Sequence, residues 1–516
     1  MSAVNALGPQ EMPPLRVQIG FFAAVLGMFM AILDIQIVAS SLNEIQAGVS
    51  ASPDEIAWVQ TAYLVAEVIM IPLASTMARI ISTRLMLVIS GGGFVLASIG
   101  CAMSDSIGQL IILRALQGFL GGAMIPLAHA ISFTLFPRHQ MGKIQALIAI
   151  VATTAPSIGP TLGGYITEHL SWHWLFLLNI VPGVLVVFGV WRFLDIDKGE
   201  RSVLEQLDVL GLALMAVFLG TLEYILEDGP RHDWLASQPV FVCTTICAVS
   251  AALFFLRVFT TPYPIIDLRL FKQRDFGIGV WLNFILGVAV YGLVYLMPLY
   301  FGTVRGFSSM QIGNIMAVTG VAMFVSAPIL GRVSDYLDLR LFVFSGFALV
   351  GWGSLMNANL TAQSDFQEFF WPQIIRGIGM MMSFIAISRV ALGNLPPRDV
   401  GQGSGILDVM RNLGGAIGLA LLNTVHLRQV SYHWNQMIPA INDGRPEVIE
   451  RLQTYQAMLS STDQPWTAGL KSIAAIINTQ AEALAFTNIF YWLGMVFFLS
   501  LPLTLLLHKA QAKGAH

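Results

Sequence analysis

The sequence predicts an all-α polytopic membrane protein, and two observations carry this prediction. The first is composition: 56% of the 516 residues are hydrophobic and only 11% are charged, whereas soluble domains carry about 25% charged residues. The second is patterning, because the chain contains fourteen apolar stretches that are each long enough to cross the hydrocarbon core as a helix of about 20 residues. These stretches lie near residues 17–39, 56–78, 85–104, 109–133, 144–167, 173–194, 207–226, 239–258, 276–301, 311–333, 341–360, 369–392, 404–427 and 485–508.

The distribution of lysine and arginine predicts which loops face the cytoplasm, since cytoplasmic loops carry the excess of these residues. Most of the 27 Lys and Arg residues lie at the two chain ends and in the loops that share their side. An even number of helices with both termini in the cytoplasm fits this bias. The opposite loops hold Arg231, Arg305, Arg428, Arg445, Arg451 and Lys471.

Several function classes are disfavoured by charge and motif content. A net charge of −3 provides no basic surface for a nucleic acid. The three cysteines all fall inside apolar stretches, which indicates packing residues and neither a disulfide framework nor a metal site. No nucleotide-binding loop, catalytic constellation or metal-ligand cluster is evident, so we expect no ATP-driven pump, no enzyme and no bound cofactor.

Two segments of the chain resemble each other and predict an internal repeat. "ILRALQGFLGGAMIP" (112–126) and "IIRGIGMMMSFIAIS" (374–388) each place an arginine in a helix rich in small residues, and each is followed by Pro-Arg some twenty residues later. Parallel repeats around a midplane site are common in secondary transporters. We therefore expect a six-helix half over residues 1–205, an inserted two-helix hairpin over 206–260, and a second six-helix half over 261–516.

The predicted outer loop between the last two helices, residues 428–484, is unlike the other loops. It is long and polar, and two of its segments place apolar residues at helical spacing. We expect short amphipathic helices there. The apolar faces of these helices either pack on the helix ends or bind a partner.

Six motifs follow one another along the chain: "LDIQIV" (33–38), "RALQGFLGG" (114–122), "APSIGPTLGG" (155–164), "WHWLFLLNIVPG" (172–183), "YPIIDLRLFKQRDF" (263–276) and "RNLGGAIG" (411–418). In this order they resemble the major facilitator superfamily, and within it the fourteen-helix drug:proton antiporters of the EmrB/QacA type, with the closer likeness to the EmrB branch. The resemblance covers nearly the whole chain. One segment departs from it: "STMARIIS" (75–82) lacks the glycines and aspartate usual in the loop after helix 2, while "GRVSDYLDLR" (331–340), after helix 10, keeps Gly331, Asp335 and Arg340.

The resemblance implies the superfamily fold and proton-driven efflux of hydrophobic or amphipathic compounds across the bacterial inner membrane. It also implies two partners in the envelope, a periplasmic adaptor of the EmrA-like membrane fusion type and an outer-membrane channel. It assigns a gating role to the antiporter motif of helix 5 and a cytoplasmic gate to the motif after helix 10, where the departure noted above implies an asymmetric latch. The residues concerned are Gly159, Pro160, Gly163 and Gly164 in the first motif and Gly331, Asp335 and Arg340 in the second.

Asp34 lies in the middle of the first apolar stretch and is the first candidate for a proton-coupling residue. A charged aspartate at the bilayer centre costs about 2.5–3.5 kcal/mol on insertion scales, so it persists when it is paired, neutral or exposed to a water-filled cavity. Arg114 is the natural cation to pair with it, because its guanidinium does not lose its charge. The alternatives are a purely structural hydrogen-bonding role for Asp34 and a backbone-capping or lipid-binding role for Arg114.

Glu67, Glu223, Asp408 and His129 are further titratable residues within apolar stretches. Glu67 has no obvious partner and is the second candidate for a proton or cation site. Asp408 lies three residues before Arg411, a spacing that favours a local structural ion pair. The position of Glu223 on the inserted hairpin favours a structural role for this residue. His129 is interpreted as a core histidine.

Three functional hypotheses remain from the sequence: a proton-driven drug exporter, an exporter or importer of a specific metabolite on the same fold, and a membrane sensor or enzyme without transport activity. The motif of helix 5 and the fourteen-helix plan favour export by analogy with the family. The identity of the substrate does not follow from the sequence.

Overall fold

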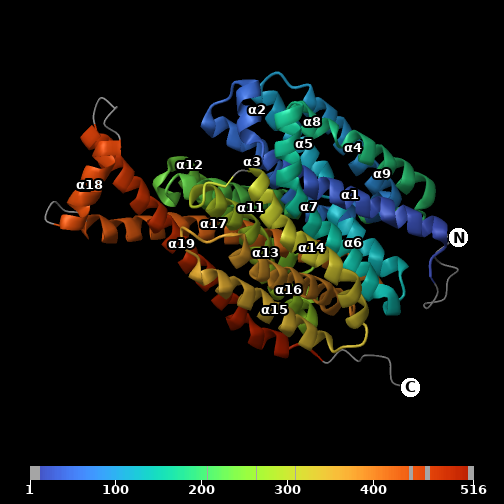
Figure 1. Cartoon of the computed structure of the whole chain (residues 1–516). Coiled ribbons are helices and arrows are strands. Elements are labelled where there is room, and N and C mark those ends of the chain that lie inside the picture. Colours follow the sequence, from blue (N-terminus) through green and yellow to red (C-terminus); the bar gives the residue numbers. More distant parts are fainter. Residues whose placement is uncertain are drawn as a thin grey trace.

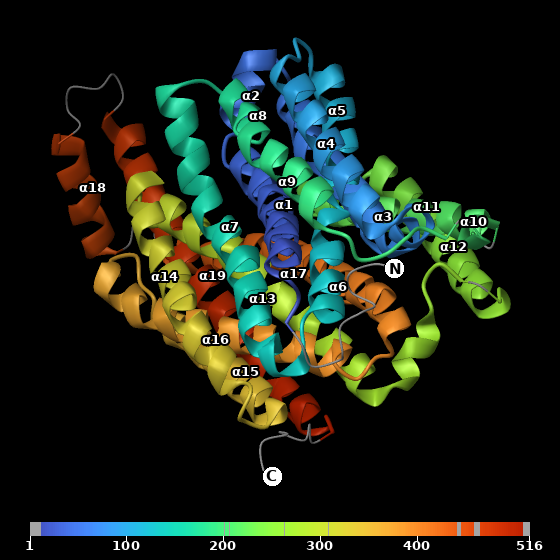
Figure 2. The same ribbon diagram turned by 90° about the vertical axis from the view of Figure 1, so that its right-hand side faces the viewer.

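The computed structural model describes residues 12–200, 202–205, 207–262, 264–307, 309–440, 445–458 and 465–508, which form a bundle of long helices (Figures 1 and 2). Within these residues, thirteen helices are long and apolar enough to cross a membrane, and a bent pair brings the total to fourteen. The predicted all-α class and the fourteen spans are confirmed.

The helices of the first half and the inserted segment follow the predicted stretches closely. They are α1 (Leu15–Ala39), α2 (Leu42–Val49), α3 (Pro53–Ile81), α4 (Thr83–Ala102), α5 (Ile107–Gly121), α6 (Met124–Leu135), α7 (Met141–His169), α8 (His173–Leu177), α9 (Ile180–Phe193), α10 (Ser202–Glu205), α11 (Val209–Asp228) and α12 (Gln238–Thr260). Short 3₁₀ turns in this region are η1 (Arg138–Gln140), η2 (Gly229–Arg231) and η3 (Trp234–Ala236).

The second half contains the longest helices of the described chain. They are α13 (Arg274–Thr303), α14 (Ser309–Val333), α15 (Leu339–Met356), α16 (Phe366–Leu392), α17 (Pro397–Met437), α18 (Pro446–Met458) and α19 (Pro465–Leu505). The 3₁₀ turns here are η4 (Leu268–Lys272), η5 (Asn357–Asn359) and η6 (Ile438–Ala440).

Local sequence fixes where two important helices begin. At the start of α3, the Ser52 hydroxyl accepts the Glu55 N–H at 3.3 Å, and the Glu55 carboxylate accepts the Ser52 N–H at 2.9 Å. Asp365 and Glu368 form the same reciprocal capping box at the start of α16. These boxes satisfy N–H groups that a helix end otherwise leaves unpaired. They set the register of the helices that carry Glu67 and Arg376.

Two predicted spans are not straight. The stretch predicted at 109–133 consists of α5 and α6, with a break at Gly122 and Ala123. Helix α7 bends by 41° between its parts Met141–Pro156 and Ile158–His169. Proline removes a backbone hydrogen bond and bends a helix, and α7 contains Pro156 and Pro160.

The two six-helix units meet along a few helices. α7 packs against α14 along their length, and α17 packs against α3 and α6. α11 contacts α3 and α17, whereas α12 packs mainly on α11 at the edge of the bundle. In Figure 1 the blue-to-cyan helices lie above the yellow-to-red ones, with the meeting surface between them.

The segment predicted as an outer loop, 428–484, is largely helical, which corrects the predicted helix ends. α17 continues past residue 427 to Met437, and α19 begins at Pro465, twenty residues before the predicted start at 485. Both helices therefore extend beyond the apolar stretch that marked their ends. α18 packs against α19, and Figure 1 shows this stalk (residues 428–440, 445–458 and 465–484) at the far left, opposite the end at which α1 begins and α19 ends.

Polar contacts join α17 and α19 at the base of the stalk. The His426 ring lies 2.8 Å from the Glu482 carboxylate, and the Asn488 amide donates to Gln429 at 3.1 Å. Each pair connects a residue of a predicted apolar stretch to a residue of the stalk. Apolarity marks where a helix leaves hydrocarbon, but it does not mark where the helix ends.

Candidate functional site

The Asp34 carboxylate lies near the centre of the first half, and its side chain is fully buried. Oδ2 accepts an N–H from Arg114 of α5 at 2.5 Å. Oδ1 accepts N–H groups from Gln117 at 3.1 Å and from Asn179, which precedes α9, at 2.7 Å. Three donors from two segments therefore converge on one carboxylate, an arrangement that holds a negative charge without bulk water.

Arg114 makes several contacts through Nε and NH1, while its NH2 group has no hydrogen-bond partner among the described residues. Its guanidinium donates to the Gln117 side-chain oxygen at 2.7 Å and to the Val59 backbone carbonyl at 3.2 Å. It also lies over the Tyr63 ring, 4.3 Å from the ring centroid. The pairing of Arg114 with Asp34 that the sequence suggested is therefore present, inside a shell that joins α1, α3 and α5.

Two residues of this shell were missed by sequence reasoning. Asn179 stood inside a quoted motif, and Ser98 in an apolar stretch, but neither was assigned a role. Asn179 donates to both Asp34 and Ser98, the second at 3.0 Å. The sequence signal for Asn179 was its position as a single amide side chain in an apolar stretch, because buried polar groups in a membrane helix require partners.

Glu67 lies on α3 and faces the surface between the two halves. It is 3% exposed, and its Oε1 atom has no hydrogen-bond partner. It lines a cavity of about 20 Å³ together with Gln36 of α1 and with Tyr291 and Arg411 of the second half. The structure thus places Glu67 at the surface between the halves, where it lines the same cavity as a cation of the opposite half.

The expected ion pair within α17 forms and has an additional partner. Arg411 lies 2.9 Å from Asp408. The His129 ring of α6 lies 3.3 Å from the other Asp408 oxygen, so this pair links the two halves. The sequence interpretation of His129 as a core histidine did not include this contact.

The helix-5 motif lies against α1. A Cβ atom added at Gly159 would overlap the Gln36 side chain, and one at Gly163 would lie 2.8 Å from the Ile37 carbonyl oxygen. A Cβ at Gly164 meets nothing within 4 Å. Gly159 and Gly163 therefore permit a close approach of helices, while Gly164 faces open space, and Pro160 is half-buried between them.

The three residues predicted to form the cytoplasmic gate after helix 10 do not form one cluster. Asp335 pairs with Arg389 of α16 at 3.0 Å, and Gly331 lies against Gly142 of the first half. Arg340 instead pairs with Asp338 at 2.8 Å. Burial raises the pKa of the Asp335 carboxyl, although the nearby Arg389 lowers it. Two of the three predicted gate residues therefore lie at the junction of the halves, and Arg340 lies beside it.

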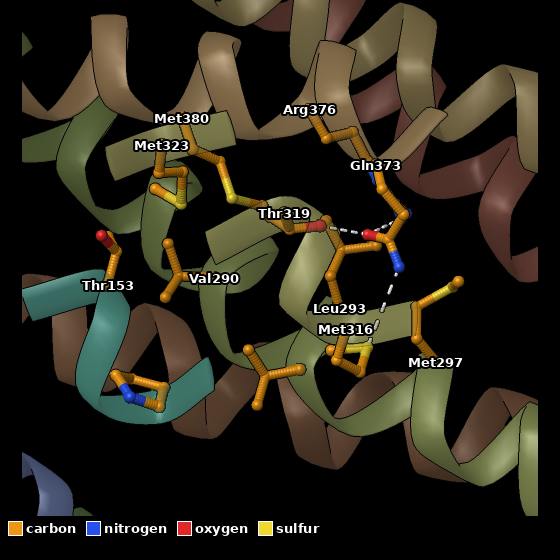
Figure 3. A pocket seen from close by; sticks show the side chains of 12 residues that line it. Thr153, Val290, Leu293, Met297, Met316, Thr319, Met323, Gln373, Arg376 and Met380 are labelled. Atoms are coloured by element: carbon orange, nitrogen blue, oxygen red, sulfur yellow. Dashed lines mark hydrogen bonds between the residues drawn. The ribbon is translucent and has the colours of Figure 1, made fainter. Parts of the chain in front are cut away.

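A second cavity, of about 30 Å³, lies between α7 of the first half and α13, α14 and α16 of the second (Figure 3). This volume has room for about one or two water molecules. Drug-sized sites measure about 300–1,000 Å³. The halves must therefore separate before a larger molecule can enter.

Two helical halves, with a buried ion pair inside the first half and small cavities between the halves, are the arrangement of a multi-pass membrane transporter. Sequence comparison supports this class: the profile of the Major Facilitator Superfamily matches residues 24–419. The chain belongs to this superfamily. Its similarity to curated EmrB proteins shows that it is a transporter of the EmrB type.

Curated relatives align with nearly the whole chain. The chain is 40% identical over 499 residues to the colistin resistance protein EmrB of Acinetobacter baumannii, covering 95% of this chain and 96% of the relative. It is 28% identical over 482 residues to the multidrug export protein EmrB of Escherichia coli K12, covering 93% of each. It is also 29% identical to the fatty acid resistance protein FarB of Neisseria gonorrhoeae, over 79% of this chain and 80% of the relative.

The fold is also similar to a solved structure. The human organic anion transporter MFSD10 (TETRAN) superposes with a TM-score of 0.58 at 14% identity, covering 95% of this chain and all of that one. At this level of identity the likeness concerns the fold alone.

Proposed function

We propose that this protein exports hydrophobic or amphipathic toxic compounds across the bacterial inner membrane in exchange for protons. The observation that carries the proposal is the buried Asp34 carboxylate, held by Arg114 within one half of a two-half transporter. Resistance and export are what the names of the EmrB and FarB relatives state. No cofactor is needed, because the proton motive force supplies the energy.

Protonation of Asp34 provides the coupling in this proposal. A proton on the carboxylate removes its negative charge and loosens its bond to Arg114, which holds α1 to α5. α1 also contacts α7, the helix that meets the second half. A structural change at Asp34 is therefore transmitted through α1 and α7 to the surface along which the halves separate.

Glu67 is the second proton site in this proposal. It faces the cavity between the halves and lies among groups of the second half. The cavity becomes part of a larger substrate site when the halves part. Proton and substrate then compete for the state with an open cavity, which is the linkage that an antiporter requires.

The orientation follows from charge. The Lys and Arg excess assigns the end at which α1 begins and α19 ends to the cytoplasm. In this proposal the stalk, which lies at the far left of Figure 1, projects into the periplasm. Exposed apolar side chains on it provide a surface for a periplasmic adaptor that leads to an outer-membrane channel; they are Ile449, Met458, Trp466, Leu470 and Ile476.

Inverted membrane vesicles test the exchange. Their lumen corresponds to the periplasm, so respiration acidifies it, and drug added outside should release protons from the lumen. A uniporter or a sensor gives no release, and a symporter carries drug and protons in the same direction. Absence of drug-triggered proton release with every compound that the protein binds would reject the proposed function.

A further inference from the structure

Arg376 of α16 is a buried cation whose position differs sharply from that of Arg114. It is 1% exposed and lines the larger cavity between the halves. Within the described residues, it makes no ion pair and stacks on no aromatic ring. Its NH2 group donates to the Gln373 side-chain oxygen at 2.8 Å, while NH1 has no hydrogen-bond partner.

Gln373 does not neutralise this charge. Its side-chain oxygen accepts from both Arg376 and Thr319. Its amide nitrogen points toward the Met316 sulfur at 3.9 Å (Figure 3). The site therefore presents N–H donors from Arg376 and Gln373 and no negative charge.

Comparison of the two repeated segments shows that Arg376 lacks the carboxylate partner that Arg114 has. In the first half, α1 supplies Asp34 to Arg114. In the second half, the arginine of the repeated segment faces a cavity to which α13 contributes only apolar side chains, namely Val290, Leu293, Val294 and Met297. An unpaired buried charge costs several kcal/mol, so such a cation is expected to have an anionic partner for part of its working cycle.

The rest of the cavity is suited to an apolar body. Four methionines line it, at positions 297, 316, 323 and 380. Methionine is flexible and polarisable and adapts to ligands of different shape. A cation at one side of a methionine-lined cavity matches a molecule with one negative group on an apolar body.

The depth of Arg376 in the membrane indicates that its anionic partner is a transported molecule and not a lipid headgroup. Arg376 is ten residues from Phe366, where α16 begins, which corresponds to about 15 Å along the helix. The hydrocarbon core is about 30 Å thick. Arg376 therefore lies near the midplane, whereas phospholipid headgroups lie at the surfaces.

We propose that Arg376, assisted by Gln373, is an anion-binding subsite that recognises the carboxylate or sulfonate of a monoanionic amphiphilic substrate. This inference rests on the proposed export function and names a substrate class for it. Binding satisfies the free guanidinium N–H group and places the apolar body among the four methionines. Because the cavity is small when the halves are closed, binding also favours the separated arrangement.

Three ligands with one ring system and different charges test the subsite: naphthalene-2-sulfonate, 2-naphthyltrimethylammonium and 2-naphthalenemethanol. Binding to the purified full-length protein is measured by calorimetry in a neutral detergent. A hydrogen-bonded charge contact predicts that wild type binds the anion at least about tenfold more tightly than the other two. Arg376→Gln should remove this preference, and Arg376→Lys should keep part of it.

Arg269→Gln is the matched control, because it removes the same charge from an exposed side chain outside the helices of the cavity. It should bind all three ligands as wild type does. Thermal unfolding identifies a misfolded variant, and the wild-type preference alone decides the matter if Arg376→Gln does not fold. An equal affinity of wild type for the three ligands, or a preference retained in a folded Arg376→Gln, would overturn the inference.

A lipid source is tested in nanodiscs. If the anion at Arg376 is a headgroup, phosphatidylglycerol will abolish the preference that is measured in phosphatidylcholine, and the substrate assignment is then wrong. Proton release from inverted vesicles separates this inference from the proposed function. Drug-triggered release without an anion preference rejects only the subsite, whereas an anion preference without release rejects only the exchange.

Discussion

Replacing Asp34 with asparagine should disrupt both stability and coupling, and the structure indicates by how much. The carboxylate accepts from Arg114 at 2.5 Å, from Asn179 at 2.7 Å and from Gln117 at 3.1 Å. Asparagine has one acceptor oxygen and one donor nitrogen. If its oxygen keeps the two amide contacts, its NH2 group faces the Arg114 N–H, and the buried guanidinium loses its counter-charge. Removing one partner of a buried pair costs about 3–5 kcal/mol.

A second substitution separates the two effects. Arg114→Gln in the Asp34→Asn background removes the stranded cation, so the double variant should regain most of the lost thermal stability. It should still lack drug-triggered proton release, because no titrating carboxylate is present. Thermal unfolding of the solubilised protein measures the first quantity, and a pH-sensitive dye in inverted vesicles measures the second.

Two results would refute this reasoning. Normal proton release in Asp34→Asn would show that the carboxylate does not couple transport, and attention would move to Glu67. Full recovery of both stability and proton release in the double variant would show that the pair is structural only.

Further predictions concern helix packing, the cytoplasmic latch and the stalk. Gly163→Leu should abolish transport because its side chain collides with α1, whereas Gly164→Ala should transport normally; equal rates would contradict the packing argument. Asp335→Asn, which weakens a contact to Arg389, should reduce drug transport in vesicles several-fold more than Arg340→Gln does, and the reverse order would reject the latch. Deleting residues 435–475 spares the His426–Glu482 pair, so proteoliposomes should retain exchange while cells lose drug resistance and adaptor co-purification; retained resistance and co-purification would exclude the stalk as the docking element.

The fold was predictable because hydrocarbon imposes a simple rule on sequence. Each span must be apolar for about 20 residues, and that rule found all the membrane-crossing helices of the described chain. It failed at the ends of α17 and α19, because a helix can continue past the residue at which its continuous apolar stretch ends. The pairs at His426 and Asn488 that support the stalk join residues far apart in sequence.

The charged part of the candidate site was predictable because charged residues are scarce in the apolar stretches. A buried acid and a buried base in one half leave few possible pairings, which is why Asp34 and Arg114 were matched from sequence. Asn179 and Ser98 are neutral, and many similar residues in the chain bind only their own helix backbone. The isolation of Arg376 also required the structure, because the lack of a partner depends on every helix around it.

Proton movement driven by a drug gradient alone tests the central claim most directly. Proteoliposomes containing the wild-type protein are loaded with a permanently charged substrate and diluted into drug-free buffer at equal pH. Exit of drug through an antiporter must bring protons in, so the lumen should acidify, and Asp34→Asn should abolish the signal. Alkalinisation of the lumen, or drug exit without any change of luminal pH, would contradict proton-coupled export.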